Sequence, residues 1–560
     1  MNALLSPRAS RALATLLVSA ALSCVTTASQ ASVKISTRPT KHMSCSGAVC
    51  TPKKPNAVLN VADLANMLAA GDVRVVSDAS ALDIVIAAPL TWTSTSRLVL
   101  SAYNSIVVEQ PVSVAGQGAL TLSPAQGGQN GVIEYRNKGH FTFWDLGSNL
   151  VISGATYSLV NSVSMLVAAV AANPSSNYAL ANNYEASTDG TYKQAPIGIG
   201  FHGMADGLGN AIAHLRIDDE TANHDVGLFA YTDGWISHLT LAQARVKGGF
   251  QTHVGALVGR SYGHLHAISV SGLVASGDYG YVGGIVGDDE GGFVDSSRST
   301  AAVNGGHAAR AGGIAGELYS AYNCVASGPV AIMDGIAGGL VGAGSYAISK
   351  SESSASVTAT VGHSAVGGLA GTAYGIDDSD ATGHVSAVDD SLAGGLAGLS
   401  LGVNRSYATG AVTVTGRNGI AGGLLGRVDG IVWNSYATGT VDTGRGGEAG
   451  SLAGLYAGNG QLNNSFATGN VKGGKYRGGV AGFADNGTAD MTSVYWDVDT
   501  SGISDPRQGV GNIKNFPGST GLTTAQFKSS LPDGFDPKTW AEQAGINNGY
   551  PYLLANPPPK

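Results

Sequence analysis

Apolar residues recur along much of this chain at intervals of about 28 residues, each inside a glycine-rich block. The block reads Gly-(Gly/Ala/Ser)-aliphatic-x-Gly, and a degenerate first copy, "GLFAY", begins at Gly227. The nine later copies begin at Gly255, Gly283, Gly312, Gly338, Gly367, Gly394, Gly422, Gly450 and Gly478. The apolar residues two positions further on are Leu257, Ile285, Ile314, Leu340, Leu369, Leu396, Leu424, Leu452 and Val480. Copies at so constant a spacing indicate a structural repeat.

Short runs of small and β-branched residues, such as "SYATGAV" and "SFATGNV", separate the blocks. Such runs, punctuated by Gly, Asn and Asp, predict strands and turns, and no helical apolar period lasts three turns in residues 225–490. Stacked units can bury the single apolar residue of each block, because each then lies on its equivalent one coil away. We therefore predict an all-β fold, a parallel β-helix (β-solenoid) with rungs of about 28 residues. The block glycines would allow corners with φ > 0 and close approach between coils.

The pattern divides the chain into five segments. Residues 1–31 combine Arg8 and Arg11 with an apolar stretch and "ASQA", which together predict a signal peptide. Residues 32–57 read as a linker, and residues 58–224 as irregular N-terminal solenoid coils with a short helix near 163–171. Residues 225–494 form the repeat solenoid. Residues 495–560 would form a small mixed C-terminal cap, with a helix near 523–529, because the last coil needs its open edge covered.

Composition and charge narrow the function. The formal net charge is −8 and 12% of residues are charged, so the basic stripe that nucleic-acid binding requires is missing. After the signal peptide, no apolar stretch reaches the roughly 18 residues of a transmembrane helix. We expect a protein that is secreted or at the cell surface through a Sec-type signal peptide, with the periplasm as an alternative. Export would allow a disulfide between Cys45 and Cys50 and leave Cys324 as a buried thiol.

The unit "GGLxG … NSYATGxV" resembles the GLUG motif, which is repeated in bacterial surface and secreted proteins. The segments "FHGMADGLGNAIAHLRI" before the repeats and "VYWDVDTSG", "GLTTAQF" and "NNGYPYL" after them resemble the flanks of such repeats in filamentous-haemagglutinin-type adhesins. The resemblance covers about residues 60–553. It implies an extracellular parallel β-helix of the adhesin type and brings no catalytic or ligand signature. The chain departs from these adhesins in lacking the Asn-Pro-Asn signatures of a two-partner secretion domain.

Acidic clusters are the main candidates for chemistry. They are Asp218, Asp219 and Glu220; Asp288, Asp289 and Glu290; and Asp377, Asp378 and Asp380. Grouped carboxylates catalyse the reaction in glycoside-cleaving enzymes, and hard oxygen ligands suit calcium. Because each cluster lies close to a glycine block, where turns belong, we interpret them as solvated corners. The last two clusters stay weak metal candidates, and we assign no catalytic residue and no cofactor.

Histidines and aromatic residues offer two further patterns. His264 and His266 would share one face of a strand, with His253 near in sequence. No third metal ligand is apparent and no histidine is followed by Glu, so the His-Glu-x-x-His zinc motif is absent and solvated turn histidines are the simpler interpretation.

Tyr407, Tyr436 and Phe466 occupy the same place in successive rungs and predict a stacked row. On a solvated face such a row would bind sugar rings, whereas in a core it would only pack. The Ala-Thr-Gly that follows each residue favours packing.

Together these patterns predict an exported, non-catalytic, adhesin-like protein that presents a repetitive solenoid face to glycans, matrix or host proteins. A β-helix polysaccharide lyase or hydrolase is the alternative, and a structural spacer or matrix component is the third interpretation.

Overall fold

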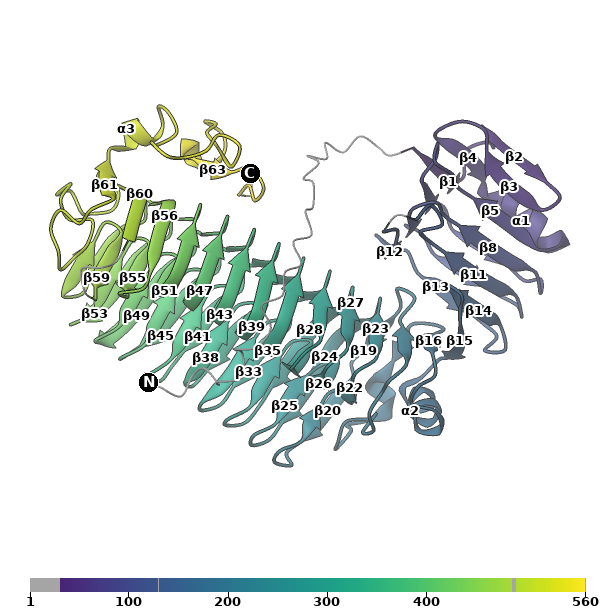
Figure 1. Ribbon diagram of the computed structural model, residues 1–560. Helices are drawn as coiled ribbons and strands as arrows, with labels where there is room; N and C mark the ends of the chain where they lie inside the picture. The colour runs from purple at the N-terminus through teal and green to yellow at the C-terminus, as the bar shows by residue number, and fades with distance from the viewer. Residues whose placement is uncertain (1–30, 129, 486–489, 559–560) are drawn as a thin grey trace.

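The computed structural model describes residues 31–128, 130–485 and 490–558. The chain is all-β and winds into a parallel β-solenoid of about 17 turns (Figure 1), which confirms the predicted fold class. The expected signal peptide, residues 1–31, lies outside the described residues except for Ala31. Among the residues that the structure describes, no helix is long and apolar enough to cross a membrane.

One rung illustrates the repeat. It contains four strands, β42 (Ala365–Gly367), β43 (Ala370–Asp377), β44 (Asp380–Ala381) and β45 (Val385–Val388). Each strand pairs in parallel with its equivalent in the rungs before and after, as β43 does with β39 (Val341–Ser349) and β47 (Ala397–Asn404). Residues at the same place in successive rungs therefore become neighbours, which is why the sequence repeats.

One face of the solenoid is a sheet whose strands end at the glycine blocks. A ten-stranded parallel sheet ends at these blocks, and the block glycines pair with one another, Gly255 with Gly283 and Gly450 with Gly478. Its strands are β21 (Asp225–Val226), β25 (His253–Gly255), β29 (Tyr281–Gly283), β34 (Ala309–Gly312), β38 (Gly335–Gly338), β42, β46 (Leu392–Gly394), β50 (Ile420–Gly422), β54 (Glu448–Gly450) and β58 (Tyr476–Gly478). All nine apolar residues two positions after these glycines lie inside, each at most 1% exposed.

Close packing, and not φ, requires glycine in the blocks. None of the nine block glycines has a positive φ, so the expectation that they turn corners is wrong for them. A Cβ on any of them would instead lie 1.9–2.3 Å from a main-chain oxygen, far inside van der Waals contact. The blocks therefore mark the places where neighbouring backbones approach too closely for any side chain.

Non-glycine residues form the left-handed corners. In successive rungs they are Asn323, Lys350, Asp378, Arg405, Asn434 and Asn464, with φ between 45° and 53°. The residue after each is a buried Cys or Ser, namely Cys324, Ser351, Ser379, Ser406, Ser435 and Ser465. The main-chain N–H of each of the first five donates to the serine hydroxyl of the next rung at 3.1–3.3 Å. This row satisfies polar groups that the corner would otherwise bury without partners.

Residues 32–57 are part of the fold, contrary to the expected linker. They contain β1 (Ser32–Ser36), β2 (Met43–Ser46), β3 (Val49–Pro52) and the start of β4 (Ala57–Asn60). Strand β1 lies between β4 and β6 (Asp83–Ile86), and the β2–β3 hairpin holds the Cys45–Cys50 disulfide. A helix that the pattern did not predict, α1 (Val61–Ala70), follows with Asn60 as its N-cap.

The strand direction reverses where the N-terminal coils meet the repeat solenoid. Strand β14 (Asn149–Ile152) pairs antiparallel with β15 (Ala155–Val160) through a turn at Ser153 and Gly154, both with positive φ. Helix α2 (Val163–Ala172) follows, where a short helix was expected. The buried Asn210 amide joins the two parts by donating to the carbonyls of Phe141 and Leu180 at 2.8 and 2.9 Å.

The C-terminal segment does more than cover the last edge. Strand β61 (Ser519–Leu522) adds to β60 (Asp490–Asp497), and the chain then turns back over the outside of the preceding rungs (Figure 1). Along this path Trp540 Nε1 donates to Asn434 Oδ1 at 3.4 Å, and Asn556 Nδ2 donates to the Arg405 carbonyl at 3.4 Å. The segment contains α3 (Thr524–Phe527), β62 (Trp540–Ala541) and β63 (Tyr552–Leu553).

Candidate functional site

A groove of about 800 Å³ follows the outer surface across the first rungs of the repeat solenoid. Gly203, Gly234, Gly263 and Gly292 line it at equivalent places in successive rungs. A Cβ at any of them would lie 2.0–2.3 Å from a main-chain oxygen of the preceding rung, so no side chain can stand there. These four glycines form a column without side chains. The positions beside this bare glycine column carry large side chains, and the groove lies between them.

Exposed aromatic rings stand along the groove. Trp235 on β23 (Trp235–Ser237) is 46% exposed, and Tyr262, Tyr319 and Tyr346 are 44%, 40% and 57% exposed. Tyr319 and Tyr346 come from adjacent rungs and stack in parallel, with ring centroids 5.3 Å apart. Apolar ring faces beside polar edges are suited to flat ligands that carry both C–H faces and hydroxyls.

Polar groups accompany the rings. The His202 Nδ1 lies 2.6 Å from Asp233 Oδ1, and both side chains line the groove. The Tyr262 hydroxyl donates to Glu290 Oε2, and this hydrogen bond, with burial, raises the pKa of Tyr262 to about 12. The hydroxyl therefore stays protonated at neutral pH. Asp233 is the carboxylate in the lining of the groove, and it stands there beside His202.

His264 and His266 lie on β27 (His264–His266), not in a turn, and half-buried rather than solvated. Strand β31 (Phe293–Asp295) places Asp295 opposite His266 in the next rung, 29 residues along the chain. His253 does not join them, because it lies on β25 in the other sheet and bonds Asp225 at 2.6 Å. The rung spacing is the signal by which the sequence could have identified Asp295.

In the acidic cluster at 288–290 only Glu290 is solvated, so our interpretation as a solvated corner is wrong for the other two carboxylates. Asp288 and Asp289 are 6% and 1% exposed. Burial raises the pKa of Asp288 to about 6, with Glu317 and Glu290 adding to the shift against His253 and Arg260. Burial also raises the pKa of Asp289 to about 7, and the neighbouring Asp288 carboxylate adds to the shift. Neither residue lines the groove.

The cluster at 218–220 is divided between solvent and core. Asp219 is 1% exposed and bonds His224 Nδ1 at 2.9 Å. Burial opposes its ionisation, but the hydrogen bonds from His224 and Thr221 outweigh burial and lower the pKa of Asp219. Glu220 accepts from Lys247 Nζ at 2.5 Å on the surface. Asp219 thus has its partner five residues along the chain, and Glu220 has its partner in the next rung.

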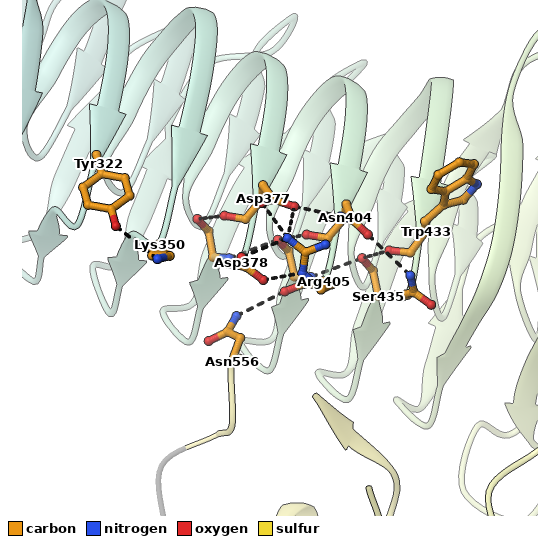
Figure 2. A network of polar contacts seen from close by, with 12 residues as sticks. Tyr322, Lys350, Asp377, Asp378, Asn404, Arg405, Trp433, Ser435 and Asn556 are labelled. Carbon is orange, nitrogen blue, oxygen red and sulfur yellow. Dashed lines mark hydrogen bonds and ion pairs between the residues drawn. The ribbon is translucent and has the colours of Figure 1, made fainter. Parts of the chain in front are cut away.

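Arg405 occupies the centre of the third cluster (Figure 2). Its Nη2 lies 2.8 Å from Asp377 Oδ2 and its Nε lies 2.6 Å from Asp378 Oδ1. A guanidinium at this point fills the place that a cation would need, so these two carboxylates already have their counter-ion. Asp380 is not at a solvated corner, contrary to our interpretation: it lies on β44 opposite Tyr407 and is 7% exposed. Burial and the Glu352 carboxylate raise its pKa to about 7.

The aromatic row of Tyr407, Tyr436 and Phe466 is stacked and buried. Ring centroids are 4.8 and 5.1 Å apart with planes within 8° of parallel. The row faces outward from the rungs, and the C-terminal segment covers it with Phe535 and Trp540. The rings therefore serve packing, and the exposed groove aromatics are the residues that the sequence pattern missed.

No protein-family model matches this chain. The chain is similar to halomucin of Haloquadratum walsbyi, 37% identical over 126 residues. That match covers 20% of this chain and 1% of halomucin. The likeness is thus confined to a small part of a much longer protein.

Proposed function

We propose that this chain is an exported, non-catalytic binding protein that holds an extended, neutral glycan in the aromatic groove. The observation that carries the proposal is the row of exposed rings beside a bare glycine column, repeated over several rungs. A sugar chain has flat C–H faces that pack on such rings and hydroxyls that bond polar side chains of the lining, such as Asp233. The net charge of −8 disfavours acidic polymers.

Three further observations support a binding role over the alternatives. The buried carboxylates with raised pKa values, Asp288, Asp289 and Asp380, do not line the groove, so the groove is not built around them. A groove running across rungs suits many shallow contacts along one polymer, as expected of an adhesin. The similarity to a part of halomucin is compatible with a protein at the cell surface or secreted.

The test is depletion of the purified protein from solution by a panel of insoluble neutral and acidic polysaccharides. We expect binding to a neutral polymer, and we expect Trp235→Ala to weaken it about tenfold, because one aromatic contact is worth about 1.4 kcal/mol. Trp433→Ala is the matched control, since Trp433 is similarly exposed, at 48%, but lies outside the groove. Equal binding by wild type and Trp235→Ala would contradict the proposal.

The same tubes distinguish the other functions. New reducing or unsaturated sugar ends that disappear in Asp288→Asn would make the chain a lyase or hydrolase. Absence of both depletion and new sugar ends across the panel would favour a structural spacer.

A further inference from the structure

Asp295 is the one carboxylate among the described residues that bonds two histidines. Its Oδ1 lies 2.6 Å from His264 Nε2, and its Oδ2 lies 2.9 Å from His266 Nδ1. The other histidine–carboxylate pairs in the described chain, such as His202 with Asp233, hold one histidine for each carboxylate. Most of these single pairs already link two rungs, so the second histidine at Asp295 calls for another explanation.

The three side chains converge because of strand geometry. His264 and His266 are two positions apart on β27 and point to the same side, and Asp295 faces His266 across the parallel pair. The three ligand atoms all lie within 4.8 Å of one another. Around a tetrahedral ion with bonds of about 2.0–2.1 Å, ligand atoms stand roughly 3.3 Å apart. The contacts of Asp295 with the two histidines, at 2.6 and 2.9–3.0 Å, would therefore have to widen by roughly 0.3–0.7 Å. The two histidine nitrogens already lie within 4.8 Å of each other.

The surroundings hold the ligands in place. The Trp235 and Phe293 rings lie 4.3 and 5.2 Å from the His264 ring, in the rungs before and after it. The ring of His238 lies edge-on to His266 at 5.2 Å. Such packing fixes ring orientation, which reduces the ordering that metal binding would otherwise require.

The site is accessible from solvent. The His264, His266 and Asp295 side chains are 29%, 19% and 15% exposed. An ion from solution can therefore reach the three ligand atoms.

We propose that His264, His266 and Asp295 form a site for a divalent transition-metal ion of the Zn²⁺ class. Two imidazoles and one carboxylate suit such ions, whereas Ca²⁺ prefers a set of oxygens alone. Three protein ligands leave at least one coordination position open. His264 also lines the groove, so the bound ion lies at its edge. The site does not depend on the proposed glycan binding, because all three of its ligands are side chains of this chain.

The experiment is equilibrium dialysis of the purified protein against Zn²⁺, without glycan, with metal counted per chain. We expect one tightly bound Zn²⁺ that Ca²⁺ does not displace. Asp295→Asn and His266→Ala should each weaken binding at least about tenfold, since loss of even an outer-shell partner costs roughly 10- to 100-fold. His253→Ala is the matched control, because His253 also bonds carboxylates between rungs but lies outside the cluster.

A second measurement needs no variant. Co²⁺ added to the wild-type protein should give visible absorption bands of a low-coordinate site, and Zn²⁺ should abolish them. Wild-type protein that retains no Zn²⁺ and shows no such bands overturns the proposal. Equal loss of Zn²⁺ in His253→Ala and Asp295→Asn overturns it as well, because binding would then be spread over surface histidines. Glycan depletion in the presence and absence of a chelator is scored separately, so either proposal can fail alone.

Discussion

Gly367→Ala tests whether close backbone approach requires the block glycines. A Cβ at residue 367 would lie 2.0 Å from the Ala370 carbonyl oxygen and 2.5 Å from Ala397 Cα in the next rung. Both neighbours are main-chain atoms, so no side-chain rotation relieves the clash. Contact at about 3.2 Å or more would require movement of roughly 1 Å in a ladder whose strands are spaced by about 4.8 Å.

The expected cost is at least about 3 kcal/mol, at the upper end of overpacking penalties, because rungs on both sides of β42 are hydrogen-bonded in register. In a solenoid the damage should remain near the altered rung, since each rung contacts only its neighbours. Hydrogen exchange is therefore the appropriate assay. Amides of residues 338–397 should lose roughly 100-fold in protection, while those of the N-terminal coils keep theirs.

Gly375→Ala is the control from the same rung. Its Cβ would meet nothing closer than the Tyr346 carbonyl oxygen at 3.6 Å, which is ordinary contact. Replacing a strand glycine by alanine without a clash should be neutral or stabilising by about 0.5–1 kcal/mol. Equal protection in Gly367→Ala and Gly375→Ala would refute the packing argument, and Gly367 would then need another explanation.

Two further substitutions test burial on the outer face. Because burial raises the pKa of Asp380 to about 7, its contribution to stability is fully present below about pH 4 and is lost as the pH rises through 7. The free energy of unfolding of Asp380→Asn should therefore rise relative to wild type between about pH 4 and pH 8, by at most roughly 4 kcal/mol. Melting temperatures of the two proteins that change in parallel with pH would contradict this. Trp540→Ala should release the C-terminal segment, because this ring packs on Tyr436 and Phe466. Limited proteolysis should then cleave within residues 523–558 while circular dichroism of the solenoid is unchanged; a segment that stays protected would show that Trp540 does not anchor it.

Several contacts could be predicted from the sequence, because residues at a constant spacing lie on one another when the rungs stack. Leu369 and Leu396 lie at equivalent positions in neighbouring rungs, and both are fully buried. The stacking of Tyr407 on Tyr436 follows from the same rule. The same spacing would also have paired His266 with Asp295, had it been applied to outward-facing residues.

No local sequence pattern could show which segment covers an outward-facing row of residues. Tyr436 is buried because Trp540, more than 100 residues later, folds back onto it, and the Asn556–Arg405 contact lies further along the same path (Figure 2). The reversal of strand direction at Ser153 likewise depends on a single turn, between β14 and β15.

The sequence by itself determined the repeat, the rung length and the buried ladder, because equal rungs in parallel register bring equivalent residues together. The tertiary structure decided which outward positions stay exposed, as at Trp235, and which are buried, as at Asp289. It also decided where a bare glycine column leaves a groove. These outcomes depend on side-chain size in neighbouring rungs and on distant segments that fold over them. The spacing of the repeat gives no information about either.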